Sequence, residues 1–252
     1  MERRKRRSRA KAEALGLEVA AAVGADAAPV VAAGPPEPVV MITPHADDDA
    51  ERLFNEAREL EVADNVDGAI ERYRQLLLKD PTHIRARNNL GCLYGRKGQH
   101  LVALEQFEAA RALDADNIDI ILKVAEALCS LSRFDQAERE LRRAQKLDPA
   151  RADVYVHLGI LYFKRGLYAQ ADIELRKATD LAPNNALAFL YRGEALNQMN
   201  RVDEALEMAS RAVSLDTTSS RSYYLMGILY DKKRMPQQAM EMYRRSREIA
   251  PS

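Results

Sequence analysis

The chain has 252 residues, 47% of them hydrophobic, and its 38 basic and 38 acidic residues leave no net charge. This balance gives no overall electrostatic field that would attract nucleic acid. The sequence also has no run of about 18 uncharged apolar residues, which is the length needed to span a membrane. The two cysteines, Cys92 and Cys129, lie outside any metal or redox spacing. We therefore expect buried or half-buried reduced thiols and a cytoplasmic protein.

The first 49 residues differ from the rest of the chain. Seven basic residues and one acidic residue occupy the first eleven positions, and residues 14–40 are rich in Ala, Val, Gly and Pro. Glu13, Glu18 and Asp26 interrupt the apolar run, so it does not read as a signal peptide. We expect residues 1–49 to form a disordered tail, first basic and then rich in Ala and Pro. Its basic arm consists of Arg3, Arg4, Lys5, Arg6, Arg7 and Arg9.

A 34-residue repeat runs from about residue 50 to the last residue. Three tracks of mostly small residues share this period: Ala69, Ala103, Ala137, Ala171, Ala205 and Ala239; Ala57, Gly91, Ala125, Gly159, Gly193 and Gly227; Leu76, Ala110, Ala144, Ala178, Ala212 and Ser246. Such tracks mark places where two helices approach too closely for a large side chain. The pattern predicts a solenoid of six repeats, at residues 50–83, 84–117, 118–151, 152–185, 186–219 and 220–252.

Each repeat is predicted to contain two helices joined by a tight turn. The turn positions are Asp64, Gly98, Ser132, Gly166, Asn200 and Arg234. Gly, Asn and Asp tolerate a left-handed turn, so Arg234 fits this position least well. Asp-Pro or Ala-Pro pairs then close four of the repeats, and proline there ends the second helix.

The residues of the repeats resemble those of the tetratricopeptide repeat family. The fourth repeat carries the family pattern most fully, at Tyr155, Leu158, Gly159, Tyr162, Ala171, Leu175, Ala178 and Pro183. The resemblance implies an all-α, right-handed solenoid whose first helices line a concave groove. It also implies a scaffold or adaptor that binds a peptide or helix of another protein in that groove.

No set of residues in the sequence has the pattern of a catalytic, metal or cofactor site, and we do not expect an enzyme. The four histidines are scattered, and Gly91, Gly95 and Gly98 lack the Gly-Lys-Ser/Thr ending of a phosphate loop. The lysine and asparagine clamp with which some family members bind acidic chaperone tails is also missing, because Phe54 and Arg58 stand at its first positions.

The register of the first helices predicts a groove with two different halves. One half is polar and basic, and it comprises Asn55, Arg58, Arg85, Asn88, Asn89 and Arg96. The other is apolar and aromatic, and it comprises Val156, Ile160, Phe163, Leu190, Tyr191, Tyr224 and Ile228. Leu122 of the third repeat is also expected to face the groove. Apolar patches rimmed by polar groups often mark contact sites, although such residues can also pack between neighbouring helices.

The sequence alone leaves two other kinds of partner as alternatives. The basic arm would suit a regulatory protein that associates with nucleic acid or an anionic membrane, and such binding would weaken with salt. Alternatively, the arm is only a solvated tail. The last repeat presents Met240 and Tyr243 on its outer face, which suggests weak homodimerisation there.

Overall fold

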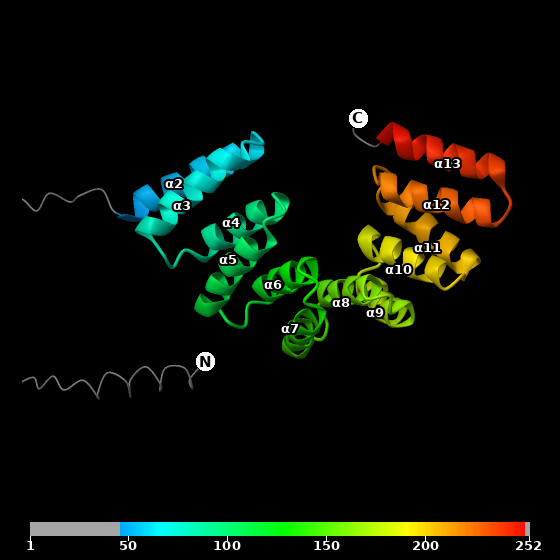
Figure 1. The fold of residues 1–252 in the computed structure, drawn as a ribbon, viewed down its shortest axis with the longest axis horizontal. Coiled ribbons are helices and arrows are strands. Elements are labelled where there is room, and N and C mark those ends of the chain that lie inside the picture. The colour runs from blue at the N-terminus through cyan, green and yellow to red at the C-terminus, as the bar shows by residue number, and fades with distance from the viewer. Residues whose placement is uncertain (1–45, 250–252) are drawn as a thin grey trace, which may run out of the picture. The chain divides into compact units, whose positions relative to one another are not determined.

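The computed structural model describes residues 46–249, and within this range it contains twelve α-helices and no strand (Figure 1). The basic arm Arg3–Arg9 and residues 1–45 of the tail lie outside this range. The prediction of disorder is wrong for residues 46–49, which form the first turn of the first helix. The helices are α2 (Ala46–Val62), α3 (Val66–Lys79), α4 (Ile84–Arg96), α5 (His100–Leu113), α6 (Ile118–Ser130), α7 (Phe134–Leu147), α8 (Ala152–Lys164), α9 (Tyr168–Leu181), α10 (Ala186–Gln198), α11 (Val202–Leu215), α12 (Ser220–Lys232) and α13 (Pro236–Ile249).

The helices pack in consecutive pairs. Each first helix contacts the second helix of its own pair, and each second helix contacts the first helix of the next pair. The first helices α6, α8, α10 and α12 also contact one another in turn. This arrangement confirms the predicted α-solenoid. The first helix begins at Ala46 rather than at residue 50, so Asp47–Asp49 lie within its first turn.

All six hairpin turns pass through the left-handed region. The positive φ values run from 55° at Asp64 to 76° at Gly166. Arg234 adopts the same conformation, with φ 59°, although its side chain suits that region poorly. Its turn is fixed by two backbone bonds of the Schellman type, from Arg234 N–H to Asp231 O (2.9 Å) and from Met235 N–H to Tyr230 O (3.0 Å). The prediction of the turn positions is therefore correct even at Arg234.

The tracks of small residues lie at the closest helix contacts. Ala69, Ala137, Ala171 and Ala205 are fully buried. At Gly159, an added Cβ would lie 2.3 Å from Leu175 Cγ. A larger side chain at these positions would therefore separate the paired helices, because the facing side chain already fills the space.

The starts of the first helices follow one chemical pattern. His83, Asn117, Asn185 and Ser219 each accept a hydrogen bond from a backbone N–H in the first turn of the next helix. Side-chain acceptors at this position stabilise a helix N-terminus. Arg151 has no such bond and instead forms ion pairs with Asp119 and Asp153.

Candidate partner-binding surface

The polar half of the predicted groove is partly exposed. Asn55, Arg58 and Arg85 are exposed to solvent. The guanidinium of Arg85 lies 4.5 Å from the centre of the Phe54 ring, and that ring is buried. Arg85 therefore covers an aromatic core residue and keeps its charge at the surface.

The other three polar residues differ in their contacts. Asn89 donates a hydrogen bond to the Tyr73 hydroxyl (2.8 Å), and Arg96 at the end of α4 pairs with Asp64 in the turn of the preceding hairpin (2.6 Å). The Oδ1 atom of Asn88 is buried without a hydrogen-bond partner among the described residues. Of these three, Arg96 is the most exposed.

The expected apolar half needs correction. Leu122, Val156 and Leu190 are buried, with 6%, 4% and 5% of their surface exposed, so they belong to the core. Tyr224 occupies the equivalent position in the sixth repeat and is 55% exposed. In the first two repeats this position holds the buried Phe54 and the half-buried Asn88. We therefore leave Leu122, Val156 and Leu190 out of the proposed groove.

Phe163 and Tyr191 are half-buried in an aromatic cluster. Their ring centres are 5.7 Å apart, and Phe163 also lies 5.6 Å from Tyr168. The Arg221 guanidinium lies 4.5 Å from the centre of the Tyr191 ring and donates to its hydroxyl (3.1 Å). These rings join α8, α9 and α10, and we call this place the filled junction. Ile160 and Ile228 are half-buried on the first helices α8 and α12.

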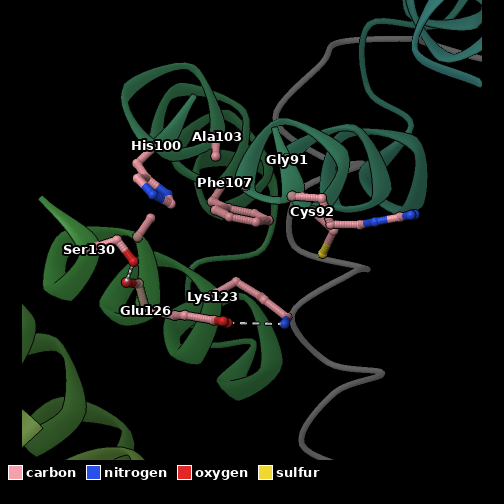
Figure 2. Close-up of a pocket in the computed structure, with 11 residues that line it drawn as sticks. Gly91, Cys92, His100, Ala103, Phe107, Lys123, Glu126 and Ser130 are labelled. Atoms are coloured by element: carbon pink, nitrogen blue, oxygen red, sulfur yellow. Dashed lines mark hydrogen bonds and ion pairs between the residues drawn. The ribbon is translucent and has the colours of Figure 1, made fainter. Parts of the chain in front are cut away.

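A cavity of about 340 Å³ lies between α4, α5 and α6, and we call this place the open junction. Figure 2 shows His100, Ala103 and Phe107 on the α5 side and the ion pair of Lys123 with Glu126 on the α6 side. The full lining comprises Gly91, Cys92, Gly95, Arg96, His100, Ala103, Phe107, Lys123, Glu126, Ala127 and Ser130. The floor is apolar and the rim carries charge.

The two junctions are built from equivalent positions. Gly95, His100 and Lys123 stand two repeats before Phe163, Tyr168 and Tyr191. An added Cβ at Gly95 would meet nothing within 4 Å. The cavity lies where the second repeat has glycine and the fourth repeat has a phenylalanine ring, and where α4 and α6 pack less closely than α8 and α10.

The environment of the cavity shifts the acid–base properties of its lining. Burial raises the pKa of the Cys92 thiol, which is half-buried and unpaired. Burial lowers the pKa of Lys123, but the Glu126 carboxylate 3.1 Å away outweighs it, and the net pKa is raised. Lys123 is therefore a stable cation beside an apolar floor. Cys129 is buried, and burial raises the pKa of its thiol to about 11.

The cavity beside Gly95 has only a weak signal in the sequence. The available signal is that the equivalent positions of the other repeats carry Glu61, Cys129, Phe163, Asn197 and Asp231, all larger than glycine.

A second depression, of about 580 Å³, lies on α12 and α13. Tyr224, Met240 and Tyr243 line it, and 69% of the Met240 surface is exposed. Tyr243 donates a hydrogen bond to Asp231 (2.7 Å). Burial, and to a lesser extent this hydrogen bond, raises the pKa of Tyr243 to about 12.

Among residues 46–249, no group of three or more His, Cys, Asp and Glu side chains is arranged to hold a metal ion. Within the same range, no helix has the length and apolar character needed to cross a membrane. The half-buried His157 stands apart from any nucleophile described above, and burial lowers its pKa.

The twelve helices of residues 46–249, packed as consecutive hairpins, define a helical-repeat protein. The chain matches the tetratricopeptide repeat family over residues 54–118, 122–175 and 173–220, and a second description of the same repeat over residues 220–252. The chain therefore belongs to the tetratricopeptide repeat family.

Relatives and solved structures agree with this assignment. The chain is 33% identical over 100 residues to tetratricopeptide repeat protein 13 of Homo sapiens, a match that covers 38% of this chain and 12% of that protein. PilF of Pseudomonas aeruginosa has a similar fold (TM-score 0.65, 20% identity, 78% of this chain and 90% of that chain). So does a chain of the APC/C hetero-tetramer Cut9-Hcn1 (TM-score 0.71, 17% identity, 82% of this chain and 42% of that chain).

Proposed function

We propose that this chain is a non-enzymatic scaffold that binds a segment of another protein along its first helices. Membership of the tetratricopeptide repeat family supports this proposal, and one chain with a similar fold is part of a hetero-tetramer. The observation that carries it is the face formed by the first helices. There, a cavity with an apolar floor lies among exposed or half-buried charged side chains.

The proposed groove differs from the one expected from the sequence. It keeps Asn55, Arg58 and Arg85 at one end and Ile160 and Ile228 toward the other. It gains Lys123 and Glu126 at the rim of the cavity. A partner segment would meet apolar anchors flanked by charges, and such anchors usually supply most of the affinity.

The decisive variant is Ile160→Glu. The equivalent positions of the third and fifth repeats carry Glu126 and Glu194, so the fold accepts glutamate there. Peptides are selected from a displayed random library against residues 46–249, and their Kd is measured by calorimetry. We expect Ile160→Glu to weaken the selected peptides at least about tenfold, because it buries a charge against an apolar anchor.

Ile173→Glu is the matched control. Ile173 lies on the second helix α9, is 64% exposed, and has Glu105 and Glu207 as equivalents. It should leave the affinity unchanged. Loss of binding in Ile173→Glu with normal binding in Ile160→Glu would move the site to the second helices and refute the proposed groove.

Self-association through the last repeat is a second candidate. The observation in its favour is that Tyr224 is exposed although its equivalents in the third, fourth and fifth repeats are covered by a following repeat. We expect Met240→Glu to abolish any dimer detected by sedimentation equilibrium. A strict monomer at high micromolar concentration would remove this candidate and leave the groove proposal untouched.

A further inference from the structure

We propose that the cavity at the open junction receives a single aromatic side chain of the partner segment. This inference rests on the proposed scaffold function and names the chemistry that one part of its surface would recognise. The partner's ring would take the place that the Phe163 ring takes within the chain at the filled junction.

Gly95 supports this inference because nothing in the fold explains a glycine there. Gly98 is needed for a left-handed turn, with φ 71°, and Gly91 is needed for close packing, since an added Cβ would lie 2.5 Å from the Phe107 ring. Gly95 has neither role: it lies within α4, its φ is not positive, and the space beside it is open. Glycine within a helix is destabilising relative to alanine. The chain carries this disadvantage beside an open cavity.

The size and floor of the cavity suit a ring. A dry apolar cavity of about 150 Å³ is enough to bind benzene, and this one measures about 340 Å³. Its floor consists of the Phe107 ring, Ala103 and Ala127, which are buried apolar residues. The equivalent ring, Phe163, packs against aromatic neighbours at 5.6 and 5.7 Å. Phe107 offers a bound ring the same kind of neighbour.

The rim favours an aromatic side chain over an aliphatic one. Lys123 and Arg96, which pair with Glu126 and Asp64, line the opening, and cations attract the faces of aromatic rings. The chain itself uses such contacts, as where Arg221 and Arg85 lie 4.5 Å from the centres of the Tyr191 and Phe54 rings. An aliphatic side chain would gain only the contact with the floor.

The test uses N-acetyl-phenylalanine methylamide as the probe and residues 46–249 as the protein. Titration is followed by the NMR signals of the Ala103 and Ala127 methyl groups. We expect saturable shifts with a Kd of about 1–10 mM, and several-fold weaker binding of N-acetyl-leucine methylamide. Gly95→Phe should abolish the shifts, because the introduced ring occupies the cavity.

Two variants keep the test decisive. Gly95→Leu fills the same space if the larger ring disturbs the fold, which circular dichroism would reveal. Ala112→Phe adds a ring at an exposed position of α5 that does not line the cavity, and it should leave probe binding unchanged. Absent shifts, equal binding of the leucine probe, or binding that persists in the filled variants would overturn the inference. The dependence of selected peptides on Ile160 would still stand in that case, so a failure here is distinct from a failure of the scaffold proposal.

Discussion

The open junction, between the second and third repeats, and the filled junction, between the fourth and fifth, are built from equivalent helices but differ in packing. The first helices α8 and α10 contact each other at the filled junction, whereas α4 and α6 have at most a marginal contact at the open junction. Both have a close glycine contact, at Gly91 and Gly159, and a left-handed turn, at Gly98 and Gly166. Besides the lining residues compared above, they differ at Asn88 against Val156, and at the pair Leu104 and Val124 against Asp172 and Arg192.

The difference shows that the fold of this solenoid constrains only part of each repeat. The small residues and the turns are repeated because the helices could not otherwise meet. The side chains between neighbouring hairpins vary, since each contact involves only adjacent repeats. One junction can therefore contribute to the stability of the fold while another leaves an open space between its helices.

The largest expected effect concerns the ion cluster of the filled junction. The buried carboxylate of Asp172 pairs with Arg192 (2.8 Å), Arg201 (3.2 Å) and Arg176 (3.3 Å). Asp172→Ala should lower the free energy of unfolding by about 3 kcal/mol, because it leaves Arg192 unpaired with little exposure to water. Urea unfolding measures the change.

A double variant tests whether the two junctions are interchangeable there. Asp172→Leu combined with Arg192→Val installs the residues of the open junction, Leu104 and Val124. It should recover most of the lost stability, because replacing a buried ion pair by apolar groups is often neutral. A double variant as unstable as Asp172→Ala would show that the junctions are not equivalent.

The next largest effect is the difference in stability lost when Gly159 or Gly91 is replaced by alanine. An added Cβ at Gly159 would strike Leu175 at its branched Cγ (2.3 Å), and Leu175 is fully buried. At Gly91 it would strike the Phe107 ring, which borders the cavity and has room to move. Gly159→Ala should therefore cost about 2 kcal/mol and Gly91→Ala less than about 1 kcal/mol. Equal losses in thermal and urea unfolding would contradict the difference in packing.

The smallest expected change in the free energy of unfolding concerns Asn88. Its Oδ1 atom is buried without a hydrogen-bond partner among the described residues, where the filled junction has Val156. Asn88→Val should raise the free energy of unfolding by about 1 kcal/mol, because an unsatisfied buried acceptor is costly. Val156→Asn is the reverse change and should lower stability. A loss in Asn88→Val would mean that the amide has a role in the native packing.

Much of the fold could be predicted from the sequence, and less of the site. The period of Ala103, Ala137 and Ala171 and the turn at Gly98 are local signals, because each is required in every repeat. Leu122, Val156 and Leu190 were assigned to the groove wrongly, since an apolar residue that faces the next hairpin has the same periodicity as one that faces a ligand. The cavity beside Gly95 could not be predicted from the glycine alone, because a cavity depends on how much space the surrounding side chains fill.

The most direct test of the relation between the two junctions is the stability of Gly95→Phe measured against Gly95→Ala. The alanine variant removes the contribution of glycine to helix propensity, so the difference reports the burial of the added ring less the lower helix propensity of phenylalanine. If the cavity is the space that Phe163 fills at the equivalent place, Gly95→Phe should be more stable than Gly95→Ala by about 1 kcal/mol in urea unfolding. A phenylalanine variant that is equally stable or less stable would contradict the equivalence.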